Sequence, residues 1–268
     1  MITMSESLAD DKYVVNSLRN GLLLMELFNK NEIVEMSLSE IAVQLQINKS
    51  SAYRLLFTLE QMGYIKKDSN KNYMLDIKVV DFSHSYLKSI SFKQEAYTIM
   101  EKLRDDTGTA VQLFTLDGIE IVNLQNIQPL GSFISNILPG LRWPAYATVI
   151  GQMLLSELTD EEIKTRFQNF SDWIAYSDAT PTNLDELLRL VNRARGQSHL
   201  TSWQKFNNDM VACTAPIKDL SSNKIMYALS ASFPVHAYTL EHFEKYIVPA
   251  LIDTAYKLSK IYKPSSNW

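Results

Sequence analysis

The segment from residue 37 to residue 72 constrains the fold most, because it carries start and stop signals for two short helices in close succession. Ser37 and Glu40 have the Ser-x-x-Glu spacing of a capping box, in which each side chain satisfies a free backbone donor at a helix start. Asn48 is a favourable N-cap for a second helix, and Gly63 is a favourable residue for ending it. The sequence therefore predicts a helix of about two turns, a tight turn and a longer helix.

The second helix is predicted to have one apolar side and one polar side. Its apolar residues recur at helical spacing: Ala52, Leu55, Leu56, Leu59 and Met62. Its other side carries donor-rich side chains close to the helix start: Lys49, Ser50, Ser51, Tyr53 and Arg54. In a helix-turn-helix, the second helix enters the major groove of DNA and its first residues contact phosphates and base edges. We therefore predict that these residues bind DNA.

Two short strands are predicted after the second helix, at residues 64–67 and 73–75, and a polar turn joins them. Together they form the hairpin of a winged helix, in which Lys67, Asn70 and Lys71 offer further donors to DNA. An ordinary three-helix bundle with a solvated polar face remains the alternative. The hairpin and the capping box favour the DNA-binding interpretation.

The overall composition is that of a globular protein with two domains. A length of 268 residues accommodates one small and one medium domain, each with its own core. No apolar run approaches the ~20 residues that a membrane helix needs, and residues 1–13 lack the apolar core of a signal peptide. We therefore expect a cytoplasmic protein with no membrane partner. A net charge of −4 argues against binding nucleic acid by charge alone, but it is compatible with a sequence-specific reader.

Metal and disulfide chemistry are not expected. The chain has one cysteine, Cys213, and its histidines have no ligand-like spacing. A single cysteine excludes an intrachain disulfide and a cysteine-rich zinc site. We therefore expect no metal and no cofactor.

Two predicted helices in the first half of the chain indicate where its two domains meet. Residues 16–29 predict the first helix of the winged-helix domain. Its apolar stripe is Leu18, Leu22, Met25 and Phe28, and Leu23, Leu24 and Leu27 widen it. Residues 77–90 contain no glycine or proline, so they predict a connecting helix rather than a flexible linker. We therefore predict a winged helix-turn-helix domain at residues 12–76, this connecting helix, and a second domain at residues 91–268.

The second domain combines helices with antiparallel strands. Asp117-Gly118 between two alternating runs is a strong hairpin signal, and Pro249 predicts a bend in a long terminal helix. Predicted helices cover residues 92–106, 145–158, 159–170, 183–195 and 239–262. Predicted strands cover residues 110–116, 119–124, 133–138, 198–203, 210–218 and 224–233, with a loop at residues 139–144. Helices beside an antiparallel sheet predict an α+β fold.

Several short patterns in the first segment resemble the recognition helix and wing of the IclR-type bacterial transcriptional regulators: Lys49-Ser50, Arg54-Leu55-Leu56, Leu59-Glu60 and Gly63-Tyr64. The resemblance continues in patches to about Tyr262, at residues 140–148, 195–196, 213–217 and 228–232. It implies a DNA-binding domain that pairs into dimers. It also implies a GAF-like second domain that binds small organic acids or aromatic metabolites.

The same resemblance implies which residues line an effector pocket: Ile137, Leu138, Gly140, Leu141, Ala145, Tyr146, Ala147, Cys213, Ser230 and Ser232. The chain departs from the family pattern in two places. Tyr146 stands where the family commonly has an imidazole, and residues 200–205 replace an acidic stretch. We therefore expect an anion of a different shape, or an uncharged or more aromatic effector.

Three of these pocket residues also have a purely structural interpretation. A lone cysteine in an alternating strand, such as Cys213, is more often a small buried hydrophobe than a nucleophile. Ser230 and Ser232 share one face of a predicted strand, so both point into a pocket or both point into solvent.

The sequence thus predicts a ligand-responsive transcriptional regulator, either a repressor or an activator, that binds a double-stranded operator as a homodimer. Pairing of dimers into a tetramer is left open. One alternative is a hydrolase or transferase that uses Cys213 or Ser230, but no nucleophile elbow, phosphate loop or paired-carboxylate motif supports it. Another alternative is an interaction module whose winged helix contacts a protein.

Overall fold

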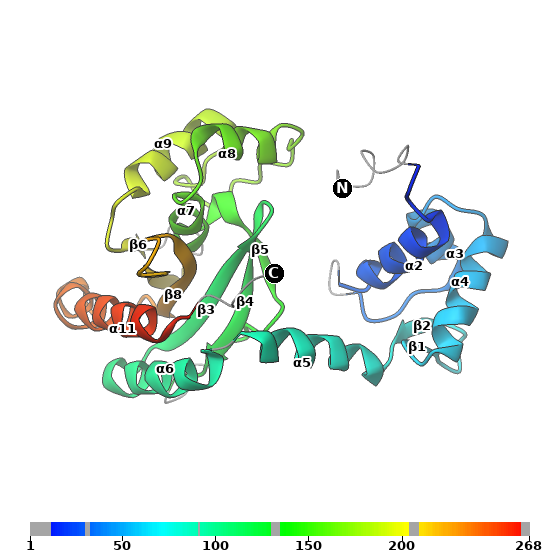
Figure 1. Cartoon of the computed structure of the whole chain (residues 1–268), viewed down its shortest axis with the longest axis horizontal. Coiled ribbons are helices and arrows are strands. Elements are labelled where there is room, and N and C mark those ends of the chain that lie inside the picture. Colours follow the sequence, from blue (N-terminus) through cyan, green and yellow to red (C-terminus); the bar gives the residue numbers. More distant parts are fainter. Residues whose placement is uncertain (1–11, 30–32, 91, 130–134, 204–208, 264–268) are drawn as a thin grey trace. The chain divides into compact units, whose positions relative to one another are not determined.

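The computed structural model describes residues 12–29, 33–90, 92–129, 135–203 and 209–263, and its contacts divide the chain into two compact units (Figure 1). The first unit ends at Ser89 and the second begins at Ile90. Each unit has a hydrophobic core of its own.

The first unit packs helices against a two-stranded hairpin (Figure 1). In chain order its elements are α2 (Asn16–Leu27), α3 (Leu38–Gln44), α4 (Lys49–Gln61), β1 (Ile65–Lys67), β2 (Tyr73–Leu75), the 3-10 turn η1 (Ile77–Val79) and α5 (Val80–Ser89). The core draws buried residues from α2, α3, α4 and both strands: Leu24, Phe28, Met36, Ile41, Leu56, Ile65 and Tyr73. The predicted winged helix-turn-helix is therefore confirmed.

Local hydrogen bonds fix the two helices of the helix-turn-helix. The Ser37 backbone N–H donates to Glu40 Oε2 at 2.8 Å, and the Glu40 N–H donates to Ser37 Oγ at 3.3 Å. Asn48 Oδ1 accepts the Ser51 N–H at 2.8 Å. Gly63 has a φ of +79°, the left-handed conformation that commonly follows the end of a helix. The predicted capping box, N-cap and helix stop are confirmed.

Only part of the predicted apolar stripe of α2 is buried. Leu24 and Phe28 lie in the core, whereas Leu18 and Leu22 are 63% and 54% exposed. The prediction was wrong for Leu18 and Leu22 because apolar residues surround most of this helix, while the contacts with α3 and α4 bury only one side of it. Met62, predicted on the apolar side of α4, is 50% exposed because it follows the last turn of that helix.

The connecting segment begins as the turn η1 and continues as α5. The rings of Phe82 and Tyr64 stack with centroids 5.6 Å apart. The Lys78 ammonium lies 4.6 Å from the centre of the Tyr64 ring and donates to the Met62 carbonyl at 2.9 Å. The start of the predicted connecting helix is therefore held against the end of α4.

The second unit is built on a six-stranded antiparallel sheet in the order β5-β4-β3-β8-β7-β6. Its strands are β3 (Ala110–Asp117), β4 (Glu120–Ile127), β5 (Arg142–Pro144), β6 (Leu200–Trp203), β7 (Met210–Lys218) and β8 (Ile225–Pro234). β3 and β4 form the predicted hairpin at Asp117-Gly118. In the centre of the sheet, Gln112 pairs with Asn126 on one side and with Ser230 on the other.

Helices cover both faces of this sheet (Figure 1). On one face lie α6 (Lys93–Thr107) and α11 (Val248–Ile261), which contact β3 and β7. On the other face lies α7 (Val149–Leu155), with α8 (Asp160–Phe167) and α9 (Leu184–Ala194) packed against it. The predicted α+β architecture is confirmed.

One predicted strand of this unit is wrong and one was missed. Residues 135–138 form no strand, and Phe133 and Ile134 lie outside the described residues. The strand is instead β5, which the sequence places in a loop, and Trp143 pairs there with Ile121. Arg142 holds this strand by donating to Asp117 Oδ2 at 2.6 Å and to Glu120 Oε2 at 3.1 Å. These contacts are between residues far apart in sequence, so no local pattern predicts them.

The predicted helix at residues 145–158 is divided. Residues Ala145–Ala147 form the 3-10 turn η2, and α7 begins only after Thr148, whose Oγ1 accepts the Gly151 N–H at 2.9 Å. A side chain on Gly151 would place its Cβ 2.0 Å from the Ala145 carbonyl oxygen. The absence of a side chain at Gly151 therefore permits the close approach of the η2 backbone.

The terminal helix is also divided, as Pro249 predicts. A short helix, α10 (Leu240–His242), leads into a π-helical turn, η3 (Phe243–Ile247), and then into α11. Pro249 lies in the first turn of α11, where a missing N–H costs least. The irregular turn directly before it accommodates the proline ring.

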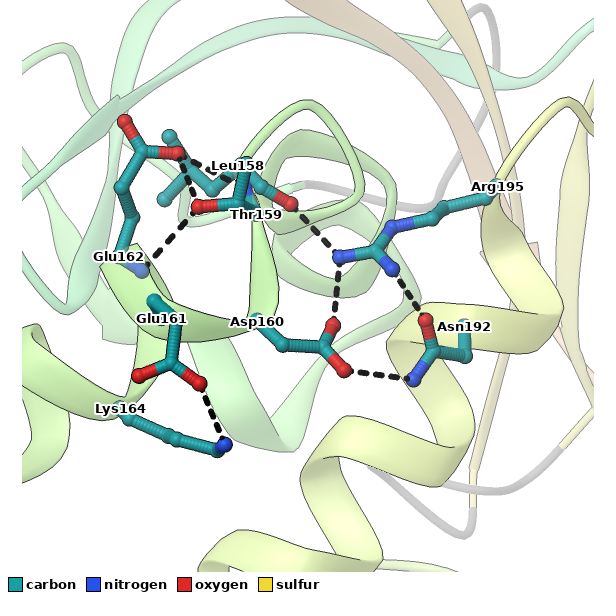
Figure 2. A network of polar contacts seen from close by, with 8 residues as sticks. All are labelled: Leu158, Thr159, Asp160, Glu161, Glu162, Lys164, Asn192 and Arg195. Atoms are coloured by element: carbon teal, nitrogen blue, oxygen red, sulfur yellow. Dashed lines mark hydrogen bonds and ion pairs between the residues drawn. The ribbon is translucent and has the colours of Figure 1, made fainter.

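Helices α8 and α9 are joined by a polar network around Arg195 (Figure 2). Its guanidinium donates to the Leu158 carbonyl at 2.7 Å and to Asp160 Oδ1 at 2.8 Å, and it also bonds Asn192. The hydrogen bond from Arg195 lowers the pKa of the Asp160 carboxyl. Because Arg195 follows α9 and Asp160 begins α8, the network fixes the two helices relative to each other.

Candidate functional site

The structure brings the predicted DNA-binding residues of α4 together on one exposed surface. Lys49, Ser50, Ser51, Tyr53 and Arg54 are all exposed in the first two turns of this helix. The opposite side of α4 is buried against the core. The helix start contributes its own partial positive charge to this surface, which favours a phosphate there.

The hairpin presents a second group of donors. Asp68 Oδ1 accepts the backbone N–H groups of Asn70 and Asn72 at 2.9 and 2.7 Å, so a side chain fixes the turn. Lys71 has a φ of +70°, which is unusual for a residue other than glycine. The side chains of Lys67, Asn70 and Lys71 are exposed, so the wing offers further hydrogen-bond donors at the surface of this unit.

The predicted effector residues are divided between the two faces of the sheet. Phe114 and Ala228 pair across β3 and β8 and lie in the core beside α7, so we call this side of the sheet the α7 face. Ser230 and Ser232 alternate with the residues between them and lie on the same face as Ala228. Cys213 pairs with Ala231, so it lies on the opposite face, which α6 and α11 cover.

Buried polar side chains gather on the α7 face. The amide nitrogen of Gln112 donates to Ser232 Oγ at 3.1 Å, and Ser230 Oγ donates to the Cys213 carbonyl at 3.1 Å. Asn126 pairs with Gln112 and shares its face, and Asn123 pairs with Phe114. Among the residues that the structure describes, the Oδ1 atoms of Asn123 and Asn126 are buried without a hydrogen-bond partner.

Such unpaired acceptors are unusual in folded proteins, because a buried polar atom without a partner costs roughly 1–3 kcal/mol. Asn123 is completely buried, and its Nδ2 donates to the Gln125 carbonyl at 3.1 Å while Oδ1 stays unpaired. A bound molecule with a hydroxyl or N–H group would satisfy these oxygens. The α7 face therefore offers hydrogen bonds to a small polar ligand.

The remaining predicted effector residues divide between the core and the surface. Ala145, Tyr146 and Ala147 are buried in the core cluster, and Ile137 packs against it. Leu138, Gly140 and Leu141 are exposed. The amides Gln112, Asn123 and Asn126 are not among the predicted residues, although polar residues within alternating, otherwise apolar strands are the signal that could have identified them.

Tyr146 has a structural partner. Its hydroxyl accepts the Ile174 N–H at 2.8 Å and donates to the Ile174 carbonyl at 3.2 Å. Its ring packs among those of Phe170 and Trp173. Burial raises the pKa of the Tyr146 hydroxyl. The Tyr146 hydroxyl therefore holds the irregular segment after α8 in place. Its hydrogen bonds are made with this segment, and its ring makes the packing contacts.

Cys213 has the properties of a core residue. It is completely buried, and burial raises the pKa of its thiol to about 12 from 9.0. At pH 8 this reduces the thiolate fraction about a thousandfold. A nucleophilic role for Cys213 is therefore not supported by its surroundings.

A thiol reagent tests this placement of Cys213. Because the thiol is buried and protonated, native chain at pH 8 is expected to react with 5,5′-dithiobis(2-nitrobenzoate) at least a hundredfold more slowly than chain unfolded in guanidinium chloride. The release of thionitrobenzoate, followed at 412 nm as about one equivalent per chain, measures both rates. Equal rates for native and unfolded chain would show that Cys213 is accessible.

Comparisons with known proteins assign the chain to a family. A family model described as "Bacterial transcriptional regulator IclR C-terminal" matches residues 84–260, and a model described as "IclR helix-turn-helix domain" matches residues 17–69. The first match alone covers more than half of the chain. The chain belongs to the IclR family of bacterial transcriptional regulators.

Individual relatives agree with this assignment. The IclR-family chain is 27% identical to the regulator XynR of Escherichia coli, over 82% of this chain and 86% of XynR. It is 25% identical to the Pca regulon regulatory protein of Pseudomonas putida, over 92% of this chain and 84% of that protein. The crystal structure of an IclR homologue from Microbacterium hydrocarbonoxydans complexed with 4-hydroxybenzoate aligns with 93% of this chain and 100% of the homologue's chain. Its TM-score of 0.75 at 18% identity shows that the two chains share a fold.

The family assignment decides between the functions that the sequence left open. The chain is a transcriptional regulator with a helix-turn-helix DNA-binding domain and a C-terminal effector-binding domain, and its relatives are regulators rather than enzymes. A hydrolase or transferase is therefore not favoured. Among the described residues, no helix has both the length and the apolar composition of a membrane-spanning segment.

Proposed function

We propose that the chain binds a double-stranded operator through α4 and the hairpin, and that a small effector bound at the α7 face changes this binding. The observation that carries the effector site is the buried pair of unpartnered oxygens on Asn123 and Asn126. The residues proposed to contact DNA are Lys49, Ser50, Ser51, Tyr53, Arg54, Lys67, Asn70 and Lys71. The proposed division is a DNA-binding domain at residues 12–76, a connecting helix at 77–90 and an effector domain at 91–268.

The operator-binding form is proposed to be a homodimer. Exposed apolar side chains support it, because a monomer would leave them in contact with water. They lie on α2 and before it, at Tyr13, Val15, Leu18 and Leu22, and on the connecting segment, at Ile77, Val80, Phe82 and Tyr86. A symmetric dimer would place two copies of α4 in half-sites about one DNA turn apart, ~34 Å. Further pairing into a tetramer would appear in the mass of the complex.

The proposed effector is a small organic acid or aromatic metabolite that carries a hydrogen-bond donor. A hydroxyl group would satisfy Asn126 Oδ1, and the stacked rings of Phe114 and Trp143, 5.8 Å apart on the same side of the sheet, would suit an aromatic ring. One fold relative was crystallised with 4-hydroxybenzoate, and a 25% identical relative is the p-hydroxybenzoate hydroxylase transcriptional activator of Acinetobacter baylyi. Hydroxybenzoates are therefore the first compounds to screen.

Replacing Asn126 with leucine is expected to weaken effector binding by about 5- to 150-fold, because a hydrogen bond of roughly 1–3 kcal/mol is lost. Without effector, the same change is expected to be neutral or stabilising, since it removes a buried acceptor that has no partner. Thermal-shift screening of hydroxybenzoates and small organic acids identifies the compound, and calorimetry then gives Kd for wild type and variant.

Gln125→Leu is the matched control for Asn126→Leu. Gln125 is the preceding residue of β4, is also half-buried and points to the opposite face. Its replacement is expected to leave effector affinity unchanged. A compound that binds both variants as tightly as wild type would place the effector elsewhere. A compound that binds but leaves DNA affinity unchanged would contradict its role as an effector, since coupling of ~1–3 kcal/mol is typical.

A further inference from the structure

A line of exposed side chains runs along the outer side of α4, opposite its buried residues. At ~3.6 residues per turn, side chains separated by four, three and four residues lie on one line: Ser50, Arg54, Phe57 and Gln61. All of them are exposed, whereas Ala52 and Leu56 are completely buried. Phe57 therefore lies in the middle of this exposed line.

Phe57 is the apolar member of this line. Its side chain is 50% exposed, and the neighbouring ring of Tyr53, also about half exposed, lies 6.3 Å away between ring centroids. The hydroxyl of Thr58, next to it, donates to the Arg54 carbonyl at 2.9 Å within the helix. The two rings thus form an apolar ridge beside the donors Ser50 and Arg54.

We propose that Phe57, with Tyr53 beside it, selects operator sequences by contact with the C5-methyl groups of thymine. In the major groove, thymine alone presents a methyl group, and an apolar side chain is the group that recognises it. This inference rests on the proposed function, because it requires that α4 enters the major groove. It adds a specificity-determining residue that the hydrogen-bonding residues of α4 do not supply.

The neighbours of Phe57 favour DNA over a protein partner at this surface. An apolar protein surface that covered the ridge would also cover Arg54 and Ser50 on the same line, and burying a guanidinium without an acceptor is costly. A DNA groove offers both kinds of partner at once: phosphate and base acceptors for Arg54, and methyl groups for the rings.

Deoxyuridine tests the proposal directly, because it pairs like thymidine but lacks the methyl group. Full-length chain is used to select binding sites from a random 30-base-pair duplex library, and the selected duplex is then synthesised with symmetric thymine pairs replaced by uracil, one pair at a time. At the contacted pair, wild type is expected to lose about fourfold in affinity per methyl, or about fifteenfold for both half-sites together. Phe57→Ala is expected to bind the thymine and uracil duplexes equally.

Met62→Ala is the matched control, because Met62 is also 50% exposed and apolar but lies off the outer line beyond the end of α4. It should retain the wild-type ratio between thymine and uracil duplexes, and Tyr53→Phe, which keeps the ring, should retain it as well. If Phe57→Ala keeps the wild-type ratio while binding the selected site, the proposal is overturned and the DNA-binding function stands. If wild type selects no sequence, the DNA-binding function itself is overturned together with the proposal.

Discussion

Replacing Lys49 and Arg54 together with alanine is expected to weaken sequence-specific DNA binding strongly and to leave the fold intact. Both side chains are exposed, so their removal opens no cavity. One well-placed arginine contact to a base discriminates by about 1–3 kcal/mol. A dimer makes this contact twice, so specific affinity should fall by roughly 30-fold to 10⁴-fold. The loss should be larger for the selected duplex than for random DNA.

Fluorescence anisotropy with a labelled selected duplex, titrated at several salt concentrations, measures this loss. Each phosphate contact that is removed makes the negative slope of log K against log salt smaller in magnitude by about 0.9. If Lys49 contacts a phosphate in both half-sites, Lys49→Ala alone should therefore reduce the magnitude of the slope by nearly two. Arg193→Ala, which removes an exposed cation from α9, should change neither quantity. Unchanged affinity of the double variant would refute α4 as the reading helix.

The starts of the two helices of the helix-turn-helix were predictable because each depends on residues within three positions of one another. The capping box at Ser37 and the N-cap Asn48 are formed as predicted, and Thr159 and Asn183 cap α8 and α9 by hydrogen bonds of the same kind. Their hydrogen bonds are local, so they do not depend on contacts with distant parts of the chain. The helix-turn-helix, and with it the proposed DNA-binding surface, could therefore be located from the order of residues alone.

The proposed effector site was only partly predictable, because it depends on pairings between distant strands. Asn126 and Ser230 come to the same face only because both pair with Gln112. Cys213 was placed with Ser230 by family resemblance, but strand alternation puts its side chain on the other face. Register decides both outcomes, and a shift of one residue would exchange the faces.

The irregular regions were the least predictable. β5 is only three residues long and is held by the salt bridges of Arg142 to Asp117 and Glu120. No periodicity can develop over three residues. Helix α2 was difficult to predict for a different reason. It has apolar residues on more than one face, and tertiary contacts determine which face is buried.

Replacing Gly151 with alanine is expected to destabilise the second unit by about 2 kcal/mol. The added Cβ would lie 2.0 Å from the Ala145 carbonyl oxygen and 2.4 Å from its Cα. Both are backbone atoms of η2, so no side-chain rotation relieves the overlap, and overpacking of this kind costs typically ~1–3 kcal/mol. Alanine is favoured over glycine within a helix by ~1 kcal/mol. The overlap should outweigh this gain because it forces α7 away from the buried turn.

Gly21→Ala separates the two effects, because nothing lies within 4 Å of the added Cβ and only the helix propensity of α2 changes. It should stabilise the first unit by up to ~1 kcal/mol. Urea unfolding distinguishes the units, since every tryptophan of the chain lies after Ile90 and its fluorescence reports only the second unit, while circular dichroism reports both. An unchanged fluorescence midpoint for Gly151→Ala would mean that α7 and η2 do not approach as closely as the structure places them. The turn that carries Tyr146 and Ala147 would then be free to move against α7.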